Sequence, residues 1–389
     1  YIIKSYSALQ PEYKADYDEA HEVAREIAEQ SFVLMKNDNN VLPIEESQDD
    51  IAIIGELART LRYQGSGSSR INPYKLVSFL EAMDGNGKKY EFAPAYDLVG
   101  DKLDGKLLEE AIQVAKNHKK VFLFVGLTDQ YESESYDRSH MTIPKSHSDL
   151  IEVMTSINPN TVVVLFGGSP VVMPWISKVT TLINAYLPGE AGGEALYNVI
   201  FGKVNPSGKL AETYPIKEED NIVSKYFPMG PKNVEYRESI YVGYRYFDSA
   251  NKNVLFPFGY GLSYTTFEYS DLKIDGMQVS YNVTNTGKVD GYEVCQLYIN
   301  DPNPVVFKAK KELKGFEKVF IKAGESVKVT HTLDYRSFAF YNTVINEWYA
   351  TNGEYNILIG ASSRDIRLQG VIHVKFDQEE KKIPDYQSI

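Results

Sequence analysis

The sequence contains few of the residues that build disulfides and metal centres. Cys295 is the single cysteine among 389 residues, so no disulfide can form within the chain and a multi-thiolate metal site is excluded. The six histidines show no HExxH pattern and no other close ligand spacing. We therefore expect neither a disulfide framework nor a bound metal.

Long apolar runs and excess positive charge are also missing. No run of about 18 apolar residues occurs, so the sequence predicts no membrane-spanning helix. The 53 acidic and 41 basic side chains give a formal net charge of -12, which disfavours a nucleic-acid backbone or an anionic membrane as a partner. These features favour a neutral substrate.

Several cofactor and nucleophile motifs are missing as well. No Gly-Lys-Ser/Thr follows the glycine-serine stretch at residues 65–70, so this is not a phosphate-binding P-loop. The dinucleotide fingerprint GxGxxG is absent, and so is the GxSxG elbow of serine hydrolases. We therefore expect no cofactor and no serine nucleophile.

The first residues, YIIKSYSALQ, carry no targeting signal. They include no initiator Met, no basic n-region and no apolar h-region, so they are not typical of a signal peptide and suggest a cut inside a longer protein. One cysteine and no visible signal favour the cytoplasm, whereas a signal on a preceding segment would instead lead to secretion.

The first half of the sequence alternates between two periodicities. Helical spacing of apolar residues predicts helices over 12–36, 106–117, 148–157 and 193–201. Short runs rich in Val and Ile at 51–54, 121–125, 162–166 and 181–186 are typical of strands buried on both faces. This alternation predicts an α/β sandwich domain with a mainly parallel sheet.

From Phe267 onward the period changes to two, in runs such as 279–283, 295–299, 327–331 and 355–359. Regular turn signals separate these runs, which predicts an immunoglobulin- or fibronectin III-like β-sandwich. The aromatic-rich, loop-like stretch before it is expected to wedge the two parts together. We therefore divide the chain into an α/β domain at 1–215, a connector at 216–265 and a β-sandwich with its C-terminal tail at 266–389.

An acidic loop, YESESYDR at 131–138, is the first candidate for chemistry. It follows the predicted strand 121–125, and ligands bind in open α/β sheets beyond the carboxyl ends of strands. Its three carboxylates in six residues repel one another, so we expect a raised pKa and a group suited to proton donation. Arg138 could pair with Asp137, and His140 could lie near the loop. The alternative is a solvated acidic loop without a catalytic role.

Two glycine-rich loops are further candidates. GSGSSR at 65–70 would let the backbone approach a ligand closely, although taken alone these residues favour a flexible turn. PGEAGGE at 188–194 precedes a predicted helix and indicates tight packing, or else a hydroxyl or anion site at the helix N-terminus.

Taken in order, these segments resemble the C-terminal half of the β-glucosidases of glycoside hydrolase family 3. The resemblance extends from Ala24 to Arg367. The matching strings are ARE at 24–26 with LMKN at 34–37 and VLP at 41–43, GSGSS at 65–69, ESYDR at 134–138, NPSGKL at 205–210, YVGYRY at 241–246, FPFGYGLSY at 256–264, ELKGF at 312–316 and GASSRDI at 360–366.

The resemblance implies a retaining enzyme in three parts. A (β/α)8 barrel supplies the nucleophilic Asp, an α/β sandwich domain supplies the acid/base Glu, and a fibronectin III-like domain supports both. Carried over by position, the acid/base is Glu134 and a substrate-binding residue is Ser68. Relatives often have Gly where this chain has Ser135, which puts the fine geometry of the loop in doubt.

The resemblance also sets the expected partners. The substrate would be a β-glucoside or an oligosaccharide with a terminal non-reducing β-D-glucosyl residue. No family nucleophile motif occurs here, so the chain should be inactive without a barrel from the same protein or a companion chain. Two alternatives stay open: a β-xylosidase or α-L-arabinofuranosidase of the same family, and a non-catalytic scaffold or carbohydrate-binding fragment.

Overall fold

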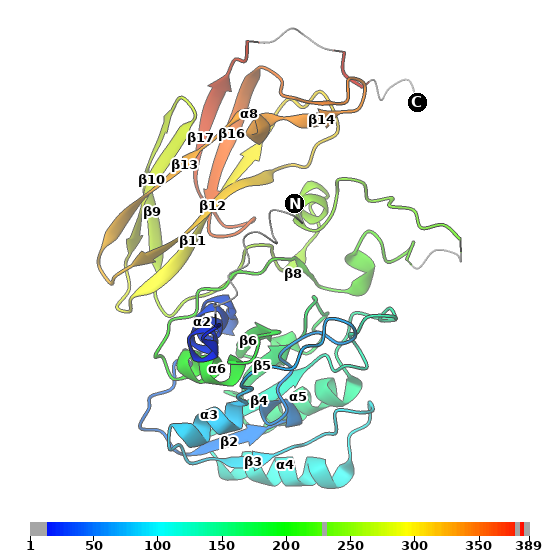
Figure 1. The fold of residues 1–389 in the computed structure, drawn as a ribbon, viewed down its shortest axis with the longest axis vertical. Helices are drawn as coiled ribbons and strands as arrows, with labels where there is room; N and C mark the ends of the chain where they lie inside the picture. The colour runs from blue at the N-terminus through cyan, green and yellow to red at the C-terminus, as the bar shows by residue number, and fades with distance from the viewer. Residues whose placement is uncertain (1–13, 228–231, 378–381, 385–389) are drawn as a thin grey trace.

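The computed structural model describes residues 14–227, 232–377 and 382–384. The lower part of the molecule in Figure 1 is built on a six-stranded sheet of order β1-β6-β5-β4-β2-β3. The strands are β1 (Val33–Asn37), β2 (Ile51–Ile54), β3 (Glu91–Ala93), β4 (Lys120–Gly126), β5 (Val162–Phe166) and β6 (Thr181–Tyr186). All neighbours pair in parallel except β1 and β6, so the expected mainly parallel α/β fold is confirmed.

Helices cover both faces of this sheet. They are α2 (Tyr17–Ser31), α3 (Phe79–Gly85), α4 (Gly105–Asn117), α5 (Lys145–Ile157) and α6 (Gly192–Ile200). The chain moves outward from β2 to β3 and then back past β2 to β4, so right-handed crossovers place α3 on one face and α4 on the other. Both α2 and α3 pack on α6, whereas α4 packs on α5, which gives three layers.

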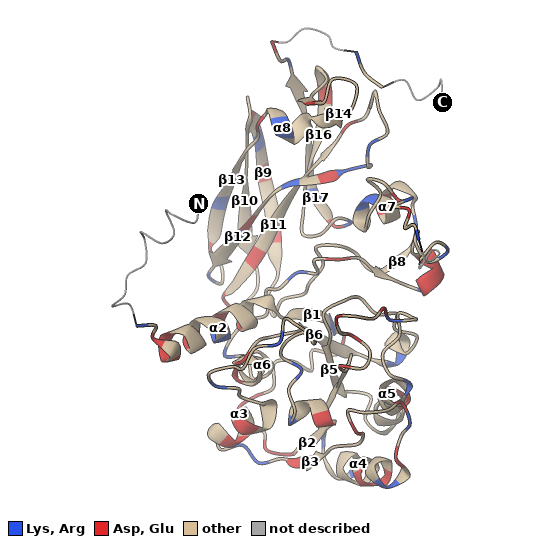
Figure 2. Cartoon of the chain, turned by 45° about the vertical axis from the view of Figure 1, so that its right-hand side comes forward, with Lys and Arg blue, Asp and Glu red and all other residues tan. Residues whose placement is uncertain are grey.

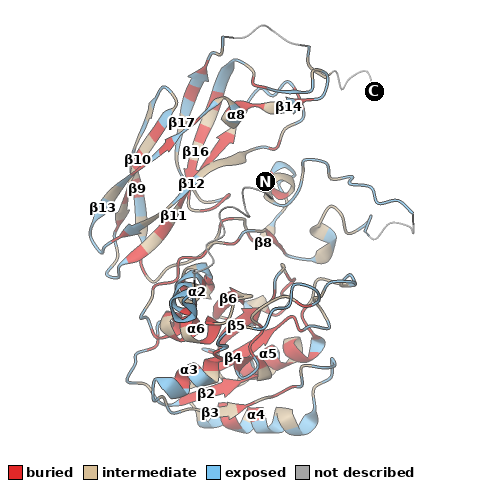
Figure 3. Ribbon diagram, viewed as in Figure 1, coloured by how far each residue is buried: buried red, intermediate tan, exposed pale blue. Residues whose placement is uncertain are grey.

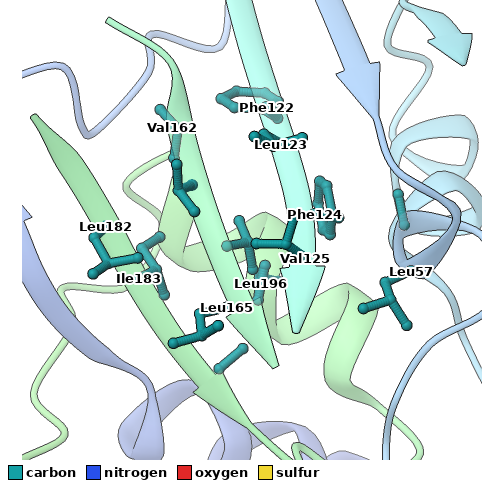
Figure 4. Packing of buried hydrophobic residues seen from close by; sticks show 14 of the residues in the cluster. Leu57, Phe122, Leu123, Phe124, Val125, Val162, Leu165, Leu182, Ile183 and Leu196 are labelled. Atoms are coloured by element: carbon teal, nitrogen blue, oxygen red, sulfur yellow. The ribbon is translucent and has the colours of Figure 1, made fainter. Parts of the chain in front are cut away.

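The core of this part lies between the helices and the four central strands. In Figure 3 the strands β2, β4, β5 and β6 are buried, while the outward faces of α3 and α4 are exposed. Figure 4 shows apolar side chains of β4, β5 and β6 interdigitating, with Leu196 of α6 among them. Val- and Ile-rich strands buried on both faces are what a covered parallel sheet requires.

The prediction of a single helix over residues 12–36 is wrong at its C-terminal end. Asp16 caps α2, the helix ends at Ser31, and Phe32 has an extended backbone with φ -62° and ψ 134°. Residues 33–37 form β1, the antiparallel edge strand beside β6. Residues 12 and 13 lie outside the described ranges.

The segment after the sheet contacts both parts of the molecule. It contains the 3-10 turn Glu218–Asp220, helix α7 (Tyr244–Ser249) and strand β8 (Val254–Phe256), which pairs with β7 (Tyr214–Pro215). The Tyr264 hydroxyl donates to the Val199 carbonyl in the α/β part at 2.9 Å, and the Tyr244 hydroxyl accepts from the Leu313 N–H in the β part at 2.8 Å.

The upper part is a β-sandwich, as expected. Its sheets have the orders β13-β10-β9 and β12-β11-β16-β17. The elements are β9 (Phe267–Asp275), β10 (Gln278–Asn285), β11 (Gly291–Asn300), β12 (Glu312–Ile321), β13 (Ser326–Thr332), α8 (Tyr335–Phe338), β14 (Phe340–Asn342), β15 (Glu347–Tyr349), β16 (Gly353–Gly360) and β17 (Ile366–Val374). Cys295 is buried in its core as a free thiol.

Acidic and basic residues are interspersed over both parts of the molecule (Figure 2). Among the described residues, no helix combines the length and the apolar character needed to cross a bilayer.

Candidate active site

Two loops meet where the strand connections diverge. The connection from β2 leads outward to β3, whereas the connection from its neighbour β4 leads inward to β5. Such a switch point leaves a crevice beyond the carboxyl ends of the two strands, where open α/β sheets bind ligands. The loop 65–70 follows β2 and the acidic loop follows β4, and the Glu134 N–H donates to the Ser66 carbonyl at 3.2 Å. The fold therefore brings the first two candidate segments together.

The side chain of Glu134 is held by the loop across from it. Its Oε2 atom accepts hydrogen bonds from both the backbone N–H and the hydroxyl of Ser68. Gly67 makes this contact possible, because a Cβ at that position would lie 2.6 Å from the Glu134 Cβ and 2.7 Å from its Oε2. Gly67 also has φ +98°, a conformation that favours glycine.

The expected rise in the carboxylate pKa is not found at Glu134. The hydrogen bonds from the Ser68 side chain and backbone lower the pKa of Glu134 below its usual value, and burial opposes them only slightly. The residue is exposed, so the desolvation that raises a carboxyl pKa is missing in this chain. The sequence-based expectation was wrong because it assumed burial of the acidic loop.

The three carboxylates of this loop have separate environments. Glu132 Oε2 accepts from the Gly168 N–H at 2.7 Å, and its Oε1 accepts from the Ser169 hydroxyl at 2.7 Å. Asp137 is exposed and forms neither a hydrogen bond nor an ion pair with Arg138. The proposed Arg138–Asp137 pair is therefore wrong: the Arg138 guanidinium turns inward and donates to the Pro170 carbonyl at 3.1 Å.

Ser135 adopts the backbone conformation that a glycine would adopt easily. Its φ is +79°, in the left-handed region where a side chain is strained. Ser135 therefore leaves local backbone strain next to Glu134.

Beneath the two loops lies a residue that the sequence did not single out. Arg62 is buried, and it hydrogen-bonds to the Ser66 hydroxyl, the Asp129 carboxylate and the Glu132 carbonyl. Asp129 also pairs with Arg70. A cavity of about 420 Å³ opens beside this network, and its polar lining includes Gln64 and Asn72.

The remaining candidates have structural roles. Gly192 and Gly193 pack tightly, since a Cβ on either would lie within 2.4 Å of Pro188 or Ser78. Nearby, His21 bridges Glu190 and Glu194 at 2.8 Å each. His140 does lie near the acidic loop, with its ring 5.7 Å from that of Tyr131. Within the described residues, no group of three or more His, Cys, Asp or Glu side chains is arranged to hold a metal ion.

The two parts of the molecule match two domain families, and the first of these is a domain of glycosidases. The model of the glycosyl hydrolase family 3 C-terminal domain matches residues 32–264, and that of a fibronectin type III-like domain matches residues 293–363. The chain belongs to glycosyl hydrolase family 3.

Individual relatives support this assignment. The thermostable beta-glucosidase B of Acetivibrio thermocellus is 48% identical over 370 residues, which cover 92% of this chain and 49% of that protein. An exo-alpha-(1->6)-L-arabinopyranosidase of Bifidobacterium breve is 40% identical, over 96% of this chain and 51% of that protein. The crystal structure of a beta-glucosidase of this family from Bifidobacterium adolescentis superposes with a TM-score of 0.93 at 41% identity, over 98% of this chain and 57% of that chain. The chain thus spans about half the length of the curated relatives it matches.

Proposed function

We propose that this chain is the acid/base-bearing part of a retaining β-glucosidase that removes terminal non-reducing β-D-glucosyl residues. The observation that carries the proposal is the exposed carboxylate of Glu134, held by Ser68 at the switch point of a family 3 fold. The β-glucosidases among the relatives support the choice of substrate. The division of the chain at 1–215, 216–265 and 266–389 stays a prediction and is part of this proposal.

Glu134 performs two proton transfers in this mechanism. As the acid it protonates the glycosidic oxygen while a nucleophilic carboxylate attacks the anomeric carbon, which forms a glycosyl-enzyme and releases the alcohol. As the resulting carboxylate it then removes a proton from water, which attacks the anomeric carbon and releases glucose. The two carboxyl groups must lie about 5–5.5 Å apart, so the nucleophile comes from a barrel that packs against this surface.

The low pKa of Glu134 in the isolated chain is compatible with this role. A docked barrel and a bound sugar would remove water from the carboxylate and place a second carboxylate nearby, and both effects raise a carboxyl pKa. Ser68 can hydrogen-bond either to Glu134 or to a sugar hydroxyl, so it serves as a substrate-binding residue in the assembled site. Without a barrel, the chain should turn over no glycoside.

The test replaces Glu134 in a preparation that combines this chain with a barrel, on one polypeptide or as two chains. Glu134→Gln should lower kcat for cellobiose by roughly 10²–10⁴-fold, the usual contribution of a general acid or base. Azide should accelerate turnover of an activated aryl glucoside by Glu134→Ala, because it attacks the glycosyl-enzyme without base assistance. Full activity of Glu134→Gln would instead support a non-catalytic scaffold or sugar-binding role.

A second substrate class is favoured by one finding. The Bifidobacterium breve relative, at 40% identity, is an α-L-arabinopyranosidase. α-L-Arabinopyranosides differ from β-D-glucopyranosides at two ring positions: they lack the hydroxymethyl group on C5, and their C4 hydroxyl is axial instead of equatorial. The test measures kcat/KM for four p-nitrophenyl glycosides: the β-D-glucoside, the α-L-arabinopyranoside, the β-xyloside and the α-L-arabinofuranoside. The glycoside with the highest kcat/KM identifies the substrate class.

A further inference from the structure

We propose that Arg62 is the positioning residue for Glu134: it fixes the two loops whose contact sets the place of the acid/base carboxylate. The inference rests on the proposed function of Glu134 and adds a residue to it.

The first observation is where the guanidinium lies. Arg62 has only 6% of its surface exposed, although an arginine is rarely buried without several partners. Its Nη1 atom donates to the Ser66 hydroxyl at 2.8 Å, and its Nη2 atom donates to the Glu132 carbonyl at 2.9 Å. Ser66 is two residues before Ser68, and Glu132 is two residues before Glu134. One side chain therefore fixes both halves of the Ser68–Glu134 contact.

The second observation is the charge balance around Arg62. Its Nη1 atom also pairs with Asp129, whose other carboxylate oxygen binds Arg70. The Glu132 carboxylate lies 3.8 Å from Nη2. Two carboxylates that follow β4, those of Asp129 and Glu132, thus face the buried guanidinium of Arg62, which follows β2.

The third observation extends the arrangement to a third strand. The Glu132 carboxylate accepts hydrogen bonds from Gly168 and Ser169, which follow β5. Arg62 and Glu132 together link the loops beyond the carboxyl ends of β2, β4 and β5. Only a planar guanidinium offers donors to three acceptors in fixed directions, so a lysine cannot reproduce the arrangement.

The consequence concerns proton transfer in particular. A general acid must be within hydrogen-bond distance of the leaving oxygen, and a displacement of about 1 Å can lower the rate 100-fold. Losing Arg62 removes the side-chain link between the Ser66–Ser68 and Glu132–Glu134 segments and leaves only their direct hydrogen bonds through Glu134 to hold them in place. The loss of Arg62 should therefore lower kcat/KM most for substrates whose leaving oxygen must be protonated.

The experiment measures kcat/KM of Arg62→Met and Arg62→Lys, again combined with the barrel, on two β-glucosides. Cellobiose has a poor leaving group that needs protonation, whereas 2,4-dinitrophenyl β-D-glucoside has a leaving group that does not. We expect Arg62→Met to lower kcat/KM for cellobiose by roughly 10- to 100-fold, and to leave the value for the dinitrophenyl substrate nearly unchanged. The kcat/KM of Arg62→Lys for cellobiose should lie between the values of the wild type and of Arg62→Met.

The ratio of the two values does not depend on the fraction of protein that is folded, so partial misfolding cannot produce the effect. Arg59→Met is the matched control: Arg59 is in the same segment but 57% exposed, pairs with Glu56, and should leave the ratio unchanged. An equal loss on both substrates in Arg62→Met would overturn the inference and leave Arg62 as a structural residue.

Glu134→Gln in the same assay separates the two proposals. If it lowers only the cellobiose value and Arg62→Met does not, the positioning role is wrong and the proposed function stands. If Glu134→Gln leaves both values unchanged, the proposed function itself fails.

Discussion

Glu134 lies in the loop after β4 and His147 contacts the last residue of β4, and different physical causes lower the pKa of each. Glu134 is exposed, and two donors from Ser68 lower its pKa. His147 is 1% exposed, and its Nδ1 atom lies 3.0 Å from the carbonyl oxygen and 3.1 Å from the nitrogen of Gly126, the last residue of β4. Burial lowers the pKa of His147 to about 4, against an ordinary value of 6.5.

The low pKa of His147 predicts a loss of stability in acid. Between pH 6.5 and 4 the unfolded chain binds a proton that the folded chain does not, so this group's contribution is fully present above pH 6.5 and is lost as the pH falls. The loss should reach about 3 kcal/mol near pH 4. Urea unfolding at several pH values, followed by tryptophan fluorescence, to which the buried Trp175 contributes, measures this loss.

In His147→Gln the free energy of unfolding should change less steeply with pH between 6.5 and 4, because Gln does not titrate. The difference in slope should correspond to the uptake of about one proton on unfolding. His373→Gln is the control, because His373 is 74% exposed and should leave the slope unchanged. An identical slope in wild type and His147→Gln would refute the assignment.

At the candidate site, the sequence indicated the groups that react but not the group that holds them. Glu134 and Ser68 stand in loops that are recognisable by their composition and by their resemblance to a family. Arg62 contacts Asp129 and Glu132, which are 67 and 70 residues away along the chain. Only the parallel pairing of β2 with β4 brings them together, and no local pattern around Arg62 indicates it.

At the scale of elements, the sequence predicted the central strands to the residue or nearly so and missed the edges. β2, β5 and β6 match their predicted runs, since buried strands are continuously apolar. β1 was read as a continuation of α2 because Phe32, Val33 and Met35 extend its apolar pattern. The four consecutive buried residues that begin at Phe32 fit a strand buried on both faces better. The three-residue strand β3 is too short to show a period.

The close approach of α3 to α6 requires a glycine at position 193, and a substitution there tests this packing. A Cβ on Gly193 would lie 2.3 Å from the Ser78 carbonyl group, so Gly193→Ala must push the two helices apart. We expect a loss of about 1–3 kcal/mol or more in the free energy of unfolding, measured by urea denaturation. Gly105→Ala, at the start of α4, meets nothing within 4 Å and should be neutral or stabilising by up to about 1 kcal/mol. Equal effects of the two substitutions would contradict the close-packing argument.

At the scale of the whole molecule, polar contacts connect the α/β part to the sandwich. Asn205 donates to the Asp290 carbonyl at 3.1 Å, and Lys318 donates to the Gln30 carbonyl at 2.9 Å. The most buried of these three contacts is the ion pair of Lys209 with Glu293 of β11, at 3.2 Å and with side-chain exposures of 12% and 4%. Such a pair favours one relative placement of the two parts, because a wrong placement leaves both charges buried without a partner.

Lys209→Met should therefore weaken the interface between the α/β part and the sandwich. Within the described part of the chain, the substitution leaves the buried Glu293 carboxylate with the Tyr269 hydroxyl, at 2.8 Å, as its hydrogen-bond donor. Breaking a buried pair typically costs about 3–5 kcal/mol. We expect the sandwich to unfold at a lower temperature than the α/β part, so that calorimetry resolves two transitions where the wild type has them closer together. Lys178→Met is the control, because Lys178 and Glu152 form an exposed pair worth at most about 1 kcal/mol. If Lys209→Met shifts both transitions by the same small amount as the control, the ion pair does not hold the two parts together, and the apolar and aromatic contacts of the connector must do so instead.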